Sequence, residues 1–402
     1  MTWVKRAGAH RATMRAVFSA AFRPFFLGAA LWSAAAVPAW LLSFSGRAAL
    51  PGALAPFIWH VHEMVFGFGF ATIAGFLLTA IPNWTGRLPL RGPRLAALAG
   101  LWLAGRLALL LSASIGPHAA AAIDLAFPAA LIAVVARELV AGRNWRNLPM
   151  LAALALLLCG SLLVHLQSIG LAYTALLGNR IGIATLLMLI ALIGGRIVPS
   201  FTRNWLAKQR AGGALPAPAG RLDLAALAIT LAALAAWVAF PGGPATPWLA
   251  LAASLALGLR LSRWRGLATL GEPLLFVLHA GYGWLVVGFG LLGLSGVVPL
   301  VPHSAALHAL AVGAIGTMTL AVMTRATLGH SGQPLSAGGA TVLVYLLVTV
   351  AALLRIAAPL AGASFLALTW AAAAAWSGAF LLFAFSYRKL LLPGKHVQAP
   401  RR

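Results

Sequence analysis

The stretch from Trp59 to Arg87 reads WHVHEMVFGFGFATIAGFLLTAIPNWTGR and indicates what kind of fold the chain adopts. Most of it is apolar, and it is long enough to cross a membrane as a helix, which takes about 20 residues. Its first two turns nevertheless carry two histidines, a glutamate and a methionine. Ionisable side chains inside a bilayer are unfavourable unless they have partners, so this segment is a candidate functional site.

The two histidines differ in the direction they would face. In a regular helix His60 shares a face with Glu63 and Gly67, whereas His62 is turned about 200° from His60. The pair therefore cannot bind one metal ion from a regular helix. Three interpretations are open: the helix is irregular here, the histidines serve two sites, or one is a ligand and the other supports it by a hydrogen bond.

The whole chain has the composition of a polytopic membrane protein. Of its 402 residues, 62% are hydrophobic and 8% are charged, and the mean hydropathy is +0.95. We therefore expect an all-α protein with about 12 transmembrane helices. The runs of apolar residues that predict them are 24–45, 57–81, 95–114, 119–140, 148–169, 174–195, 222–240, 247–261, 271–293, 303–324, 339–360 and 363–386.

Basic residues alternate between the two sides of these spans. They precede the first span and follow every even-numbered one. The loops that follow the odd-numbered spans carry a single basic residue, Arg47. By the positive-inside rule, the basic loops and both termini are expected to be cytoplasmic. The net charge of +24 then reflects topology, and no nucleic-acid partner is expected.

A linker rich in glycine, proline and alanine, AGGALPAPAG, occupies residues 211–220. We expect it to be cytoplasmic and to divide one integral membrane domain into two six-helix halves, 1–210 and 221–402. The two halves show no convincing sequence repeat, so an internal duplication is left open.

Ionisable residues of different spans fall at similar depths in the expected topology. Counting about 1.5 Å per residue from the span ends places most of them in the outer half of the membrane, at levels that agree within a turn or two. His279 is expected nearer the midplane. A polar cluster in the outer half is therefore predicted. The residues placed there are His60, His62, Glu63, Arg106, Asp124, His165, Arg180, His308 and Arg355.

These side chains suit haem or copper. Imidazole binds both metals, and arginines at the same level could pair with haem propionates. The single cysteine, Cys159, excludes a C-x-x-C-H attachment motif, so any haem would be non-covalent. The simpler interpretation is that an isolated intramembrane histidine packs with a hydrogen bond. The histidines of the second, fifth and tenth spans fall at similar depths, which favours the interpretation that they are metal ligands.

Several motifs resemble those of the NnrS family, and the similarity covers the chain from about Phe22 to Tyr387. The resemblance implies a polytopic bacterial inner-membrane protein that contains haem and copper and is associated with denitrification and with protection from nitric oxide and nitrosative stress. It does not assign the ligands, which therefore rest on the depth argument. The motifs are WHVHEMVFGF, GFLLTAIPNWTG, LWLAGR, GGRIVPSFTRNWL and HALAVGAIGTMTLAVMTRATLGHSGQPL.

We therefore expect haem b and copper as cofactors and nitric oxide as the small molecule that is bound or reduced. Glu63 is the expected catalytic residue, because a carboxyl group buried near the iron can deliver a proton at neutral pH. The expected haem ligands are His62 and His308, with His60, His165 and His279 as further ligands to haem or copper and Arg106, Arg180 and Arg355 as propionate partners.

The sequence leaves open whether nitric oxide is turned over or only bound. A haem-dependent nitric oxide reductase or another NO-detoxifying oxidoreductase is one interpretation, with quinol in the lipid bilayer as a candidate electron donor. The alternative function is a membrane transporter that uses the same histidine and carboxylate cluster as an ion or metal site, which the six-plus-six arrangement favours. A sensor is less favoured, because the chain shows no soluble output domain.

Overall fold

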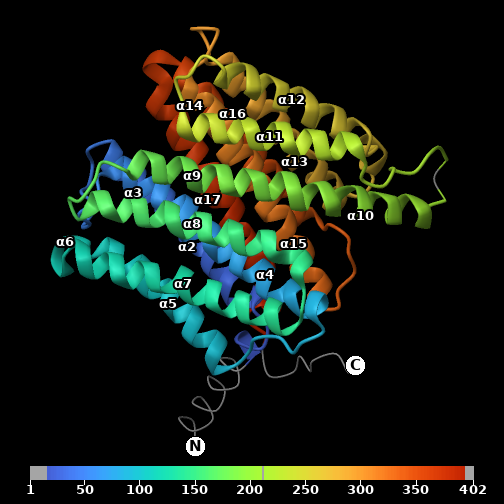
Figure 1. Cartoon of the computed structure of the whole chain (residues 1–402), viewed down its shortest axis with the longest axis horizontal. Coiled ribbons are helices and arrows are strands. Elements are labelled where there is room, and N and C mark those ends of the chain that lie inside the picture. The colour runs from blue at the N-terminus through green and yellow to red at the C-terminus, as the bar shows by residue number, and fades with distance from the viewer. Residues whose placement is uncertain (1–15, 211, 394–402) are drawn as a thin grey trace, which may run out of the picture. The chain divides into compact units, whose positions relative to one another are not determined.

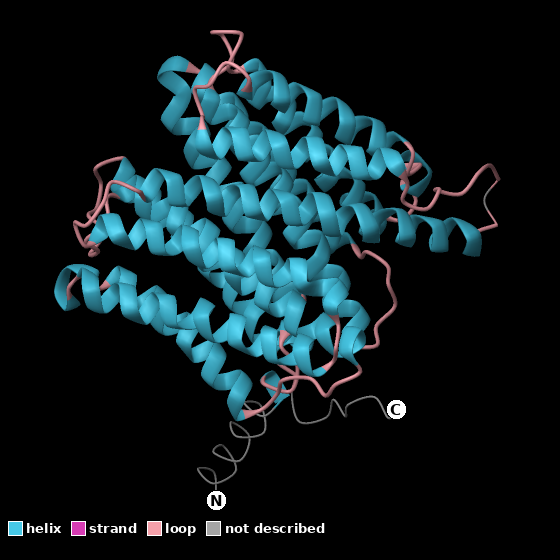
Figure 2. Ribbon diagram, viewed as in Figure 1, coloured by secondary structure: helices cyan, strands magenta, loops and turns pink. Residues whose placement is uncertain are grey.

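The computed structural model describes residues 16–210 and 212–393, which form helices and loops with no β-strand (Figures 1 and 2). Within these ranges, 11 helical segments are long and apolar enough to cross a membrane. The prediction of an all-α polytopic membrane protein is therefore confirmed. The segments are Phe22–Phe44, Pro56–Thr85, Pro93–Leu110, Pro117–Ala141, Trp145–Ser168, Ala175–Lys208, Arg221–Ala239, Pro273–Leu294, His303–His330, Gly339–Leu360 and Gly362–Ser386.

The eighth expected span, 247–261, forms a helix that is shorter than the 11 candidate spans. This helix, α12, covers Thr246–Ser262 and has 17 residues. At about 1.5 Å per residue it measures about 26 Å, slightly less than the hydrocarbon core of about 30 Å. The orientation of the termini stays a prediction, because residues 1–15 and 394–402 lie outside the described residues.

The helical elements follow one another along the chain, and Figure 1 labels most of the α-helices. Three of them are π-helical segments inside longer helices: η1 (Glu63–Phe68), η3 (Ile190–Gly194) and η5 (Ala309–Gly316). The α-helices are α2 (Phe22–Phe44), α3 (Pro56–His62), α4 (Gly69–Thr85), α5 (Pro93–Leu110), α6 (Ser112–Ile115), α7 (Pro117–Ala141), α8 (Leu148–Ser168), α9 (Ala175–Leu189), α10 (Gly195–Lys208), α11 (Arg221–Ala239), α12 (Thr246–Ser262), α13 (Pro273–Leu294), α14 (His303–His308), α15 (Thr317–His330), α16 (Gly339–Ala357), α17 (Phe365–Ser386) and α18 (Arg388–Leu391).

The sixth span is longer than predicted, because the helix continues past residue 195 as α10. Pro199 lies inside α10 and has no N–H to donate to the carbonyl of Gly195, four residues earlier. The guanidinium of Arg260 donates to that carbonyl instead, at 3.4 Å, and to the carbonyl of Ala191 at 2.8 Å. A neighbouring helix thus supplies the donor that proline lacks.

The described residues form two compact units, each built from separate parts of the chain. In the first unit α7 packs against α4, α5 and α8, and in the second unit α13 packs against α12, η5 and α16. The first unit consists of Met1–Gly182, Met323–Leu335 and Phe380–Arg402, and the second of Ile183–Val322 and Ser336–Ala379.

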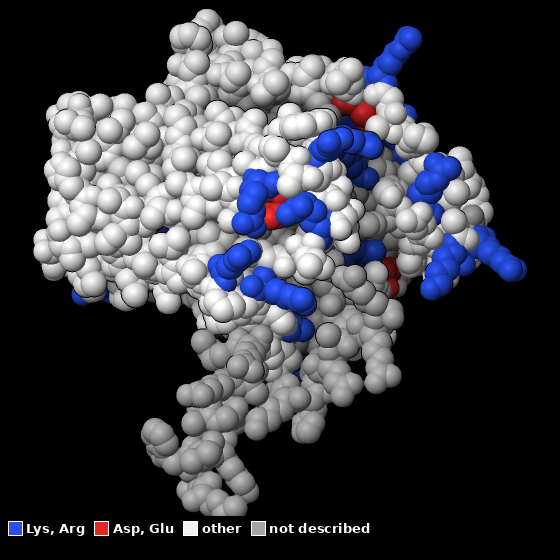
Figure 3. All heavy atoms as spheres, turned by 60° about the horizontal axis from the view of Figure 1, so that its bottom comes forward, with Lys and Arg blue, Asp and Glu red and all other residues white. Residues whose placement is uncertain are grey.

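Several span ends that are expected to be cytoplasmic contact one another within the first unit. Glu138 pairs with Arg87 and with Arg137, each at 2.6 Å, which joins the ends of the second and fourth spans. The rings of Phe22 and His330 lie 6.1 Å apart, at the start of the first span and the end of the tenth. Figure 3 shows the basic side chains gathered in patches, with broad areas that carry no charge. This arrangement fits helices whose sides face lipid.

Candidate metal centre

Five ionisable side chains form a buried polar cluster in the first unit. They come from α3, η1, α5, α7 and α8, and none of them is more than 3% exposed. The sequence predicted four of them as site residues and placed the fifth at the same depth. We call this set the His62 cluster; its members are His62, Glu63, Arg106, Asp124 and His165.

The backbone is irregular where the cluster begins. His62 is the last residue of α3 and Glu63 is the first residue of the π-helical segment η1. Their side chains meet, with His62 Nδ1 at 3.4 Å from Glu63 Oε1. The indole N–H of Trp102 donates to the carbonyl of Gly67, inside η1, at 2.9 Å. The helix is therefore irregular, but only after both histidines, which lie in the regular helix α3 and still face different directions. Such π segments are frequent at functional sites.

One guanidinium holds both carboxylates of the cluster. Arg106 donates to Glu63 at 2.6 Å through one terminal nitrogen and pairs with Asp124 through the other. The indole N–H of Trp32 donates to the same oxygen of Glu63 at 2.7 Å. Buried charges are tolerated when they are paired and hydrogen-bonded in this way.

Two glycines make room for these ion pairs. A Cβ atom at Gly67 would lie 2.6 Å from the guanidinium of Arg106 and 2.8 Å from the carboxylate of Glu63. A Cβ atom at Gly105 would lie 2.8 Å from the carboxylate of Asp124. Any larger residue at either position would push the charges apart, since real Cβ contacts are not this short.

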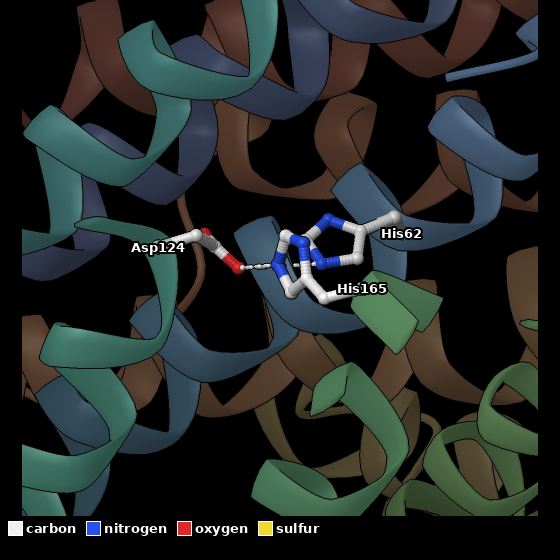
Figure 4. Close-up of side chains that lie close together, drawn as sticks. All are labelled: His62, Asp124 and His165. Atoms are coloured by element: carbon white, nitrogen blue, oxygen red, sulfur yellow. Dashed lines mark hydrogen bonds and ion pairs between the residues drawn. The ribbon is translucent and has the colours of Figure 1, made fainter. Parts of the chain in front are cut away.

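Two histidines and an aspartate converge within the cluster (Figure 4). His62, Asp124 and His165 each offer one ligand atom, and these three atoms lie within 4.8 Å of one another. The Nε2 atom of His165 is 2.9 Å and the Nε2 atom of His62 is 3.3 Å from the same oxygen, Oδ2 of Asp124. The hydroxyl of Ser161 lies 3.2 Å from His62 Nε2 and 3.4 Å from that oxygen.

These separations suit a small metal ion. Bonds of about 2.0–2.1 Å from an ion to nitrogen or oxygen place neighbouring ligand atoms about 2.9–3.4 Å apart in octahedral or tetrahedral geometry. The Nδ1 atom of His165 is buried and has no hydrogen-bond partner among the described residues. The donor set and its two distances to Asp124 Oδ2 are compatible with a first-row transition metal.

Two further predicted site residues of the first unit are not among the three converging ligand residues. The ring of His60 stacks on Trp40, with the ring centroids 4.1 Å apart, and Arg180 is half-buried in α9. Their roles as metal ligand and propionate partner stay predictions.

The remaining predicted residues belong to the second unit. His279 Nε2 lies 2.8 Å from the hydroxyl of Thr202, and its ring packs under Gly266 in a loop that was expected to be cytoplasmic. The Nδ1 atom of His308 lies 2.6 Å from the carbonyl oxygen of Ser304, and Arg355 stacks over Phe365. None of these three residues belongs to the His62 cluster.

Sequence reasoning did not assign Asp124, Ser161 and Trp32 to the site. Asp124 had a usable signal, because it is one of only five acidic residues and fell at the depth of the histidines. Ser161 and Trp32 had none, since a serine or tryptophan is common in any transmembrane helix.

The fold and the cluster define a class: a multi-pass α-helical membrane protein with buried histidines and carboxylates arranged as a candidate metal centre. The family follows from comparison with known proteins. The chain belongs to the NnrS family, whose model, described as NnrS protein, matches residues 16–394. The resemblance seen in the sequence motifs is thereby confirmed. A search of curated proteins finds no match.

Proposed function

We propose that this protein is a metal-containing membrane protein of the nitric oxide response in the bacterial inner membrane, and that His62, Asp124 and His165 hold a copper ion in it. Membership of the NnrS family supports the nitric oxide response. The observation that carries the metal proposal is the convergence of the three buried ligand atoms. The same donor set also suits non-haem Fe(II), and the copper content that the resemblance implies favours copper.

Glu63 fixes the ring proton of His62 on Nδ1, which leaves Nε2 available to bind a metal ion. A carboxylate that accepts hydrogen bonds from Arg106 and Trp32 acts only as an acceptor, so the Nδ1–H of His62 donates a hydrogen bond to its other oxygen at 3.4 Å. The Nε2 lone pair of His62 then faces Asp124 Oδ2. Two lone pairs at 3.3 Å repel unless a proton or a metal ion joins them, and the proposal places a metal ion at this point. Metal-bound histidines are commonly oriented by such a carboxylate.

Glu63 is thus proposed first as a positioning residue for His62. Its role as proton donor in nitric oxide reduction, which the sequence suggested, stays part of the same proposal. A bound copper ion would supply a redox-active Lewis acid at which nitric oxide can bind. Reduction would in addition require an electron donor, for which quinol in the bilayer is the proposed class.

Metal analysis of the detergent-purified protein tests the centre. We expect about one copper per chain in the wild type and less than about one tenth of that in His165→Ala and Asp124→Asn, since each removes a ligand. His118→Ala is the matched control, because His118 is exposed and lies on the same helix as Asp124. Unchanged copper in both ligand variants would refute the centre. Copper that moves across proteoliposome membranes would instead favour the transporter.

A further inference from the structure

Trp102 donates a hydrogen bond into the π-helical segment that follows His62. Its indole N–H lies 2.9 Å from the carbonyl oxygen of Gly67, inside η1. The Trp102 side chain is 6% exposed, so this contact lies in the interior. Gly28 makes room for the ring, because a Cβ atom at Gly28 would lie 2.8 Å from Cζ3 of Trp102. The packing around the indole therefore holds it against one backbone carbonyl.

A π segment leaves a backbone carbonyl for a donor from outside the helix. In η1 the N–H of Gly69 donates to the carbonyl of Met64, five residues earlier instead of four. Where the helix returns to α-helical spacing, the backbone donors pass over one carbonyl. Side chains that insert into the hydrogen-bond ladder of a helix are a known cause of such irregularities. The indole of Trp102 supplies a donor of this kind at Gly67.

The same arrangement occurs in the second unit. Arg260 donates to the carbonyl of Ala191, inside the π segment η3, at 2.8 Å. There too the donor is buried and comes from another helix, α12. Two chemically different side chains thus meet the same backbone requirement at two π segments. This recurrence supports the interpretation that the outside donor stabilises the π form.

The form of η1 decides where His62 faces relative to Asp124. The helix α3 ends in His62, whereas α4 packs against α7, which carries Asp124. The segment η1 joins α3 to α4, so it sets the rotation of one ligand relative to the other. One residue of an α-helix corresponds to a rotation of about 100°. If η1 became α-helical, His62 would turn by about this angle, and its Nε2 atom would leave Asp124 Oδ2, which now lies 3.3 Å away.

One face of α5 carries two donors to η1. Trp102 and Arg106 are four residues apart, so they lie on the same face of the helix. Trp102 donates to the backbone of η1, and Arg106 donates to the carboxylate of Glu63 at 2.6 Å. The helix α5 itself packs against α7. The two donors therefore link the π segment to the helix that carries Asp124.

We infer that Trp102 is a positioning residue for the candidate metal centre: its N–H holds η1 in the π form, and the π form points His62 and Glu63 into the cluster. Trp102 does not touch the metal ion and acts through the backbone at Gly67. The inference deepens the proposed function and rests on it for the identity of the metal. The effect of Trp102 on the direction of Glu63 does not depend on a bound ion.

Trp102→Phe tests the inference, because it keeps an aromatic ring and removes the N–H. In the oxidised, copper-loaded protein we expect the electron paramagnetic resonance spectrum to show two coupled imidazole nitrogens in the wild type and one in Trp102→Phe, as His62 turns away. Copper affinity, measured by chelator competition, should fall about 10- to 100-fold. Trp40→Phe is the matched control, because Trp40 is buried in the same unit and its indole nitrogen has no hydrogen-bond partner among the described residues. A wild-type spectrum and affinity in Trp102→Phe would overturn the inference.

A second measurement, on the metal-free protein, separates this inference from the proposed copper centre. Glu63→Gln should lower the thermal unfolding midpoint, because it removes a negative charge that pairs with Arg106. In the Trp102→Phe background this loss should shrink to less than about half, since Glu63 is then already turned away from Arg106. In the Trp40→Phe background the loss should stay complete. Equal losses in all three backgrounds would overturn the inference even where copper binds, whereas a reduced loss in a protein that binds no copper would support it and refute only the centre.

Discussion

Arg106 and Asp124 form an ion pair between α5 and α7, and the free end of the same guanidinium holds Glu63 at 2.6 Å. All three side chains are buried. The arginine therefore ties three helical segments together and also fixes the direction of the carboxylate nearest the candidate ligands. We therefore expect stability and the proposed metal binding to depend on the same residue.

Replacing Arg106 with alanine should destabilise the protein by about 3–5 kcal/mol, because two buried carboxylates lose their counter-charge. The change is measured as a fall in the thermal unfolding midpoint of the detergent-purified protein. Arg87→Ala should change stability by at most about 1 kcal/mol, because the side chain of Arg87 is 44% exposed. Equal effects of the two substitutions would contradict the buried network.

Gly67→Ala should disturb the cluster without changing any charge. The added Cβ atom would lie 2.6 Å from Arg106 and 2.8 Å from Glu63, so we expect a loss of about 1–3 kcal/mol and weaker copper binding. Gly100→Ala is the matched control, because Gly100 is a helical glycine with open space around its Cβ position. That change should be neutral or stabilising by up to about 1 kcal/mol. A Gly67→Ala protein with wild-type stability and copper content would show that the ion pairs tolerate displacement.

Ser161→Ala should lower copper affinity by about 10- to 100-fold while leaving the three ligands in place. Its hydroxyl donates to Asp124 and contacts His62, so it orients both. Competition with a copper chelator measures the affinity. The unfolding midpoint without metal should change little, whereas the rise in midpoint on adding copper should shrink. If chelator competition matches that of the wild type, Ser161 has no orienting role.

Arg260 should behave as a structural arginine in the second unit. It is buried and donates to Asp223 at 2.8 Å, to Tyr282 at 2.9 Å and to the carbonyl of Ala191. We expect Arg260→Met to lower stability by about 3–5 kcal/mol, because Asp223 is left without its closest partner. The double variant with Asp223→Asn should recover part of this loss, since the effects of contacting residues are not additive. Strict additivity of the unfolding midpoints would argue against the pair, and copper and haem contents should stay unchanged throughout.

Much of the fold could be predicted from the sequence. Apolar runs gave the long helices, and the one run that fell short of spanning length, 247–261, was among the shortest. The extension of the sixth span to Lys208 could not be predicted, because the donor that lets the helix pass Pro199 comes from Arg260, 61 residues further along the chain. Local pattern contains no information about such a partner.

The candidate site was predictable in part. Depth counting brought His62, Glu63, Arg106 and His165 to one level, and the structure joins them. Depth does not give the direction of a side chain around the helix axis, so His60 could not be distinguished from His62. The π-helical segment begins after both histidines, so it sets the direction of α3 relative to α4, and it has no signature in the residues themselves.

The segment η1 also has a consequence for the history of the chain. A π turn holds one more residue than an α turn, so it corresponds to a single insertion in an otherwise regular helix. Deleting one residue between 63 and 68 would restore a continuous α-helix and rotate everything on one side of the deletion by about 100° relative to the other. Inserting or deleting a single codon would therefore change the direction in which His62 faces relative to α4, and the same holds for His308 at η5.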